Sequence, residues 1–115
     1  MQKNIYGKTS EIIASDYLKQ KGYKILAINY KNKIGEIDII AKDKNIVVFV
    51  EVKARSSKAF GHPYEAINNV KQLKIRRVAE LYLITKHLTE IPCRFDTISI
   101  LGQEDYEIEH LENAF

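Results

Sequence analysis

Two β-type segments that follow one another, residues 35–41 and 45–55, limit the folds open to this chain more than any other feature. Both are rich in isoleucine and valine, and a turn at Asp43-Lys44 would join them as an antiparallel hairpin in which Asp38 faces Phe49. Because side chains alternate between the faces of a strand, one face of this hairpin is wholly apolar. That face must be covered, most simply by a helix. Its side chains are Ile37, Ile39, Ala41, Ile46, Val48, Val50 and Val52.

The other face of the hairpin becomes charged at the end far from the turn, where Glu36, Asp38, Glu51 and Lys53 gather. Asp38 and Glu51 would be diagonal neighbours about 7–8 Å apart at Cα, so both carboxylates could reach one ion. Such oxygen ligands suit Mg²⁺ or Mn²⁺. Lys53, on the same face as Glu51, could then hold a water or neutralise charge on a phosphate. The alternative is an ion-paired rim in which Lys53 only neutralises Glu51.

Helical and strand-like segments make up the rest of the chain. We expect a first helix from a cap at Thr9 or Ser10 to about Lys21, a strand at 23–29, a second helix capped by Asn69 and ending near Lys86, and strands at 94–101 and 106–111. The spacing in the second helix predicts one buried side, formed by Val70, Leu73, Val78, Leu81 and Tyr82. A chain of 115 residues is expected to form one domain, 1–115, of the α/β class.

The charge distribution, the cysteine count and the length of the apolar runs limit the kinds of protein and partner that fit this chain. Residues 1–90 contain 17 Lys and Arg against 9 Asp and Glu, whereas residues 91–115 contain 1 against 6. A basic body with an acidic tail suits a polyanionic partner on one side, although two solvated faces would give the same counts. One cysteine excludes an internal disulfide. The polar start and a longest apolar run of five residues predict a cytoplasmic protein without a membrane partner.

Several short blocks of the sequence carry a resemblance to a known family. They are residues 35–41 (GEIDIIA), 48–56 (VFVEVKARS), 71–72 (KQ), 93–96 (CRFD) and 112–115 (ENAF). In this order they resemble the YraN family of small bacterial proteins, which are predicted endonucleases of the restriction-endonuclease-like superfamily, related to archaeal Holliday junction resolvases. The resemblance spans essentially the whole chain. It implies a restriction-endonuclease-like core, with a central mixed five-stranded sheet flanked by helices.

The resemblance also assigns roles to individual residues. Asp38 and Glu51 match the two metal-binding acids, and the carbonyl of Val52 matches the backbone ligand between them. Lys53 matches the catalytic lysine. Glu11, on the first helix, matches an acidic residue near the metal. The sequence departs from the family at the residue before Glu11, where a serine stands in place of the frequent glycine and could donate a hydrogen bond instead.

The function implied by this resemblance is a Mg²⁺- or Mn²⁺-dependent endonuclease that hydrolyses phosphodiester bonds in DNA, with branched or structured DNA as the expected partner. By analogy, it could work as a homodimer. Two alternatives stay open, a non-catalytic nucleic-acid-binding module and a protein-interaction factor with the same fold. The presence of Asp38, Glu51 and Lys53 together favours the enzyme. The expected phosphate-contacting side chains are Arg55, Lys58, Lys71, Gln72 and Lys74. Asp96, outside the metal set, is expected to pair with Arg94 or Lys53.

Overall fold

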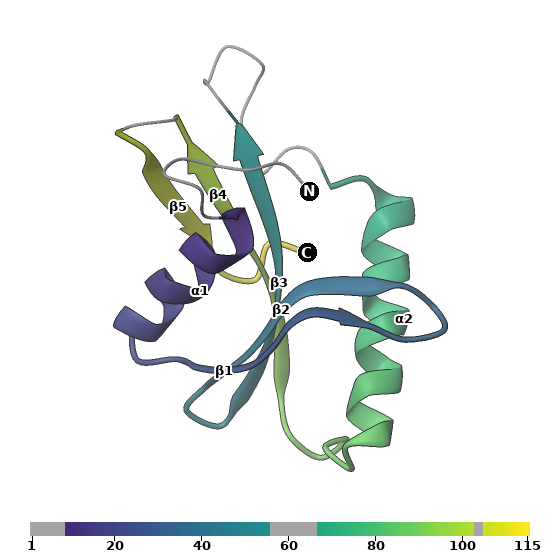
Figure 1. Ribbon diagram of the computed structural model, residues 1–115. Helices are drawn as coiled ribbons and strands as arrows, with labels where there is room; N and C mark the ends of the chain where they lie inside the picture. The colour runs from purple at the N-terminus through teal and green to yellow at the C-terminus, as the bar shows by residue number, and fades with distance from the viewer. Residues whose placement is uncertain (1–8, 56–66, 103–104) are drawn as a thin grey trace.

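A computed structural model describes residues 9–55, 67–102 and 105–115. Its elements are α1 (Ser10–Gln20), β1 (Lys24–Lys31), β2 (Glu36–Asp43), β3 (Ile46–Arg55), α2 (Asn69–Thr85), β4 (Cys93–Leu101) and β5 (Glu107–Leu111). The strands form one sheet in the order β1-β2-β3-β4-β5, in which β3 and β4 are parallel and the other neighbours are antiparallel. The two helices lie on opposite sides of this sheet (Figure 1). The expected α/β fold with a mixed five-stranded sheet is confirmed.

Helix α1 covers the face of the sheet that the sequence marks as apolar. Thr9 is its N-cap, and the Thr9 side chain accepts a hydrogen bond from the backbone N–H of Ile12 at 3.3 Å. The helix ends at Gln20, with Lys21 as its C-cap, before Gly22, whose φ of +95° favours glycine. The apolar cluster under α1 contains Ile13, Ala14, Leu18, Tyr23, Ile39, Ala41, Val48, Val50, Ile98 and Ile100.

Helix α2 covers the opposite face and begins one residue earlier than expected. The cap is Asn68, whose side chain accepts a hydrogen bond from the backbone N–H of Lys71 at 2.8 Å. The buried side chains of α2 are Ile75, Val78, Ala79 and Tyr82, which pack on Phe49 and Phe95. The expected burial of Val70 and Leu73 is wrong, since they are 79% and 56% exposed. Both lie off the i, i+3, i+4, i+7 stripe that begins at Ile75.

The hairpin of β2 and β3 has a different register from the one expected. Its turn is at Lys44-Asn45, so Asp43 pairs with Ile46 and Phe49 pairs with Ile40, not with Asp38. A turn placed one residue later moves every partner by two, which leaves each side chain of β3 on its predicted face. Asp38 is thereby carried two positions closer to Glu51 along the ladder.

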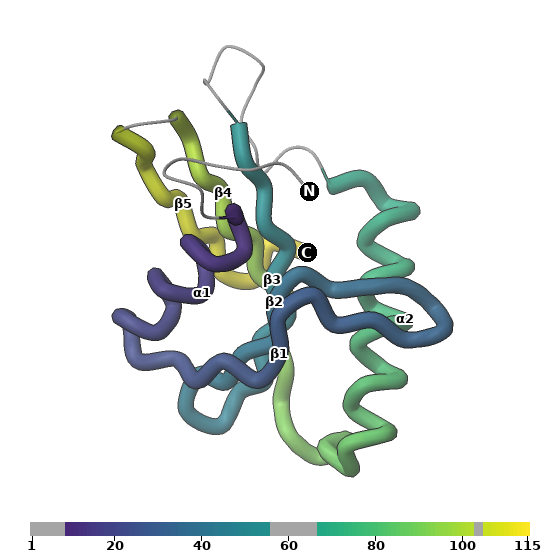
Figure 2. The backbone as a smooth tube through the Cα atoms, viewed as in Figure 1, coloured from purple at the N-terminus to yellow at the C-terminus, as the bar shows by residue number. Residues whose placement is uncertain are grey.

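Strands β2 and β3 separate beyond the pair formed by Ile39 and Val50, whereas β3 stays paired with β4 as far as Arg55. The hairpin of β1 and β2 continues away from β3 and passes over α2 (Figures 1 and 2). Its tip lies close to the helix, since a Cβ atom added at Gly35 would be 3.2 Å from Cγ2 of Val78. Strand twist therefore places Ile37 in the apolar cluster under α2, which corrects its expected place beside Ile39.

Candidate functional site

The carboxylates of Asp38 and Glu51 come together at the point where β2 and β3 separate. The backbone N–H of Val52 donates a hydrogen bond to Oδ2 of Asp38 at 2.8 Å. A donor at the open side of β3 is thus satisfied by a side chain of β2, which fixes the direction of that side chain. Glu51, next to Val52, is only 7% exposed. Val52 itself turns its side chain into the cluster under α1.

The electrostatic environment of Asp38 is unusual for a carboxylate. Burial and then the negative charge of Glu51 raise its pKa from 3.8 to about 7, and the charge of Glu11 acts in the same direction. The hydrogen bond from Val52 opposes this shift but does not cancel it. A buried carboxylate whose pKa is raised by a neighbouring acid is an arrangement often found at functional sites.

Two lysines lie beside the acids, and they differ in their contacts. The ammonium of Lys71, on α2, forms an ion pair with Oε2 of Glu51. Within the described residues, Glu51 receives its ion pair from Lys71 and none from Lys53, so the predicted rim pair of Glu51 with Lys53 is absent. Burial and the nearby charge of Lys71 lower the pKa of Lys53. For Lys71, burial is outweighed by the hydrogen bond and charge of Glu51, which raise its pKa.

Glu11 lies in the first turn of α1 and is turned inward, with 5% of its surface exposed. Its Oε1 atom is buried and has no hydrogen-bond partner within the described residues, and the same holds for Oγ of Ser10. The influence of Glu11 on the pKa of Asp38 places its charge near the acid pair. A buried carboxylate oxygen without a partner is costly unless a cation or water satisfies it.

The residues present fit a hard divalent cation in part. In residues 9–55, 67–102 and 105–115, no group of three or more His, Cys, Asp or Glu side chains is arranged to hold a metal ion. Mg²⁺, however, commonly binds through one or two carboxylates and completes its shell with waters and substrate phosphates. Asp38 and Glu51 supply those two carboxylates.

The side chains expected to contact phosphates differ in their surroundings. Arg55 ends β3, and its Nε atom is buried without a described hydrogen-bond partner. Gln72 donates from Nε2 to the carbonyl of Ile67 at 3.0 Å, so it braces the start of α2. Lys74 is exposed on α2, with its carbon chain beside Gly35. Lys58 lies outside the described residues.

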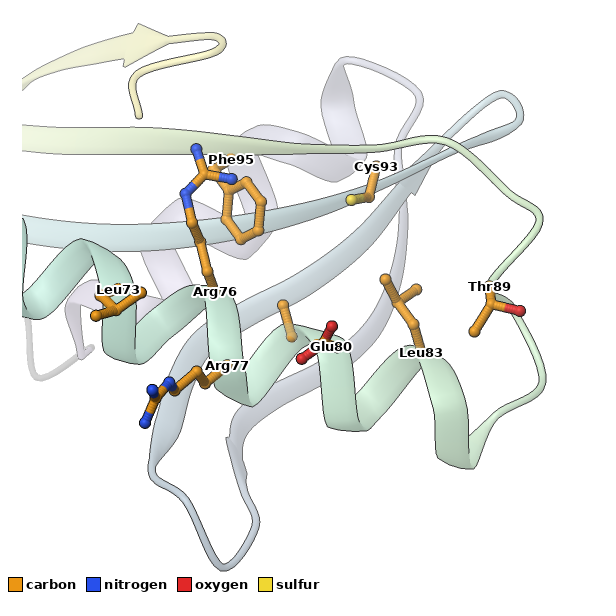
Figure 3. A pocket seen from close by; sticks show the side chains of 9 residues that line it. Leu73, Arg76, Arg77, Glu80, Leu83, Thr89, Cys93 and Phe95 are labelled. Atoms are coloured by element: carbon orange, nitrogen blue, oxygen red, sulfur yellow. The ribbon is translucent and has the colours of Figure 1, made fainter.

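A separate groove of about 540 Å³ lies between α2 and the start of β4 (Figure 3). The guanidinium carbon of Arg76 is 4.6 Å from the centre of the Phe95 ring on its wall. Leu73, Leu83 and Cys93 are also among its lining residues. Glu80 is the acid that lines it, and neither Asp38 nor Glu51 is among its lining residues.

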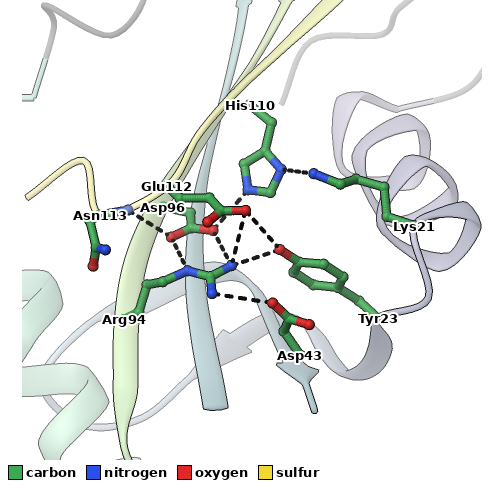
Figure 4. A network of polar contacts seen from close by, with 8 residues as sticks. All are labelled: Lys21, Tyr23, Asp43, Arg94, Asp96, His110, Glu112 and Asn113. Atoms are coloured by element: carbon green, nitrogen blue, oxygen red, sulfur yellow. Dashed lines mark hydrogen bonds and ion pairs between the residues drawn. The ribbon is translucent and has the colours of Figure 1, made fainter. Parts of the chain in front are cut away.

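A buried polar network ties together the other side of β4 (Figure 4). Asp96 is fully buried and accepts hydrogen bonds from Nε and Nη2 of Arg94, at 2.9 and 3.1 Å, from the backbone N–H of Asn113, and from His110. Burial would raise the pKa of Asp96, but the hydrogen bonds from His110 and Arg94 hold it below its usual range. The predicted pairing of Asp96 with Arg94 is confirmed. The contact of His110 with Asp96 could not be predicted from the sequence, since it arises only when β5 pairs with β4.

Comparison with known proteins agrees with the resemblance seen in the sequence. A family model described as "Uncharacterised protein family UPF0102" matches residues 10–100, which include every described residue of the acid site. The chain belongs to the UPF0102 family. This is the YraN family that the sequence blocks indicate.

Curated UPF0102 proteins align along nearly the whole chain. The protein of Alkaliphilus oremlandii is 51% identical over 118 residues, which cover 100% of both chains. Those of Thermodesulfovibrio yellowstonii and Clostridium botulinum are 51% and 48% identical and cover 95% of this chain and 94% and 92% of their own. Among the described residues, no helix is long and apolar enough to cross a membrane.

Proposed function

We propose that this UPF0102 protein is a metal-dependent endonuclease that hydrolyses phosphodiester bonds in DNA. The observation that carries the proposal is the meeting of Asp38 and Glu51, from two different strands, with the hydrogen bond from Val52 holding Asp38 in place. The high cost of ionising both acids together supports a cation as their natural partner. The fold is compatible with a restriction-endonuclease-like core.

The residues divide the chemistry between them. Asp38 and Glu51 would hold the metal, and the inward carboxylate of Glu11 would bind a water or add charge beside it. The metal, when bound, makes a water more acidic and offsets charge on the phosphate. Lys53 lies on the face of β3 that carries Glu51, so its ammonium would hold the attacking water or neutralise charge developing on the phosphoryl oxygens. The carbonyl of Val52 would be the backbone ligand.

Branched or structured DNA is the proposed substrate. Lys74, on α2, and Arg55, at the end of β3, could contact phosphates without reading bases. Symmetric cuts across a junction would need two sites, and therefore two copies of the chain.

The test is a cleavage assay with a labelled four-way junction, duplex and single strand, in Mg²⁺, Mn²⁺ or EDTA. Asp38→Asn and Glu51→Gln should each lower the cleavage rate about 100-fold or more, since metal affinity depends on both acids. Glu36→Gln is the matched control, because Glu36 lies two residues from Asp38 on β2 and has a distant, exposed ion pair with Lys31 at 3.7 Å. It should cleave normally.

Other outcomes favour the alternatives. Binding of DNA without cleavage, unchanged in both variants, would indicate a non-catalytic binding module. If the protein neither binds nor cleaves DNA, the nuclease proposal is overturned, and the result points to a protein-interaction factor.

A further inference from the structure

Lys71 contacts an acid of the site, whereas the sequence predicts that it contacts DNA phosphates. Its ammonium pairs with Oε2 of Glu51, and the charges of Glu51 and Asp38 both act on it. We infer that Lys71 is a built-in counter-cation, which occupies the position of a divalent ion beside Glu51 and must leave before that ion binds. This inference rests on the proposed function, since it requires a metal at Asp38 and Glu51.

The sequence of α2 directs Lys71 to this position. Lys71 lies four residues before Ile75 and seven before Val78, on the same stripe as the buried side chains of the helix. Asn68 caps the helix through the N–H of Lys71 itself, so the backbone of this residue is fixed. Lys74, one turn further along and also exposed, is not paired with an acid of the site in the described structure.

The two partners differ in exposure, and this makes exchange possible. The side chain of Glu51 is 9% exposed, so its charge needs a partner in place. The side chain of Lys71 is 45% exposed, so its ammonium can move into water without unfolding α2. Lys71 therefore neutralises Glu51 in the metal-free protein and can give way to a metal ion.

The test measures Mn²⁺ binding by calorimetry, and thermal unfolding in EDTA, at pH 8. Lys71→Met should bind Mn²⁺ about tenfold more tightly than the wild type, because no cation competes for Glu51. In EDTA, Lys71→Met should unfold about 5 °C lower than the wild type, because Glu51 loses its partner. Lys74→Met removes the same charge one turn away and should change the Mn²⁺ affinity less than twofold.

The outcomes separate this inference from the proposed function. If wild type and Lys71→Met bind Mn²⁺ equally, or if Lys74→Met tightens binding as much, Lys71 is not the competing cation, while the metal site stands. If no form of the protein binds Mn²⁺, the metal-dependent function is overturned, and the exchange with it.

Discussion

Asp38 accepts a main-chain hydrogen bond from Val52 in a position where its ionisation is costly. Such an arrangement is typical of functional sites, since a chain selected for stability alone would avoid two neighbouring buried acids. Lys71 partly offsets the cost by pairing with Glu51. A bound divalent cation would offset more of it, so the stability of the metal-free protein should report on the acid pair.

Stability without metal should depend on the protonation of Asp38. Its pKa is about 7 in the folded protein and near 3.9 in an unfolded chain, so the folded state binds the extra proton between these values. Stability therefore falls as the pH rises through this window, by about 2–3 kcal/mol between pH 5 and 8. Urea unfolding in EDTA measures it, and Asp38→Asn should remove that part of the pH dependence.

The exposed Asp105→Asn variant is the control for this measurement and should keep the wild-type slope. Equal pH dependence in the wild type and in Asp38→Asn would show that Asp38 is an ordinary carboxylate.

At the scale of elements, the start of α2 determines where Lys71 lies. The Asn68 side chain bonds to the N–H of Lys71, and Gln72 bonds back to the carbonyl of Ile67. These two contacts close the first turn of the helix over the acid pair. The order of the helix start and the geometry of the site are therefore linked.

Asn68→Ala should lower the free energy of unfolding by about 1 kcal/mol, the usual cost of an N-cap. It should also tighten Mn²⁺ binding, because a frayed first turn no longer holds the ammonium of Lys71 against Glu51. Asn69→Ala, at the exposed first helical residue, should have little effect on either quantity. Urea unfolding measures the stability, and calorimetry measures the Mn²⁺ affinity. An Asn68→Ala protein as stable as the wild type would exclude the cap as the organising contact.

Much of this element-scale structure could be predicted, and the exceptions have physical reasons. Alternation in 35–55 identified both strands and the faces of β3, because a slip of two residues changes no side chain's face. The alternation could not predict that β2 and β3 separate, because this separation depends on strand twist and on the packing of α2 under the hairpin tip at Gly35. The spacing of Lys71 to Ile75 indicates that Lys71 lies on the buried side of α2. The predicted buried side included Val70 and Leu73 instead, because they are apolar.

At the scale of the whole molecule, the parallel pairing of β3 and β4 organises the fold. Helix α2 lies between these two strands in the chain and packs on the face that continues to Glu51. On the other side of the sheet, the network around Asp96 fastens Arg94, His110 and Asn113. Two acids of the C-terminal part, Asp96 and Glu112, thus form internal ion pairs with Arg94, whereas the lysines and arginines of α2 are exposed.

Binding to DNA should therefore be strongly dependent on salt. Four phosphate contacts would weaken binding about 100-fold between 50 and 200 mM salt. Lys74→Met should reduce the slope of log affinity against log salt by about one. Lys86→Met, at the other end of α2, should leave the slope unchanged. Fluorescence anisotropy with a labelled junction measures these slopes. A slope near zero would contradict a phosphate-binding surface.

The most direct test of the account is an anomalous diffraction map from a crystal soaked in Mn²⁺. We predict a peak between the carboxylates of Asp38 and Glu51, with the ammonium of Lys71 withdrawn from Glu51. A map without a peak at these acids, with Lys71 still paired to Glu51 in saturating Mn²⁺, would contradict the metal-dependent nuclease.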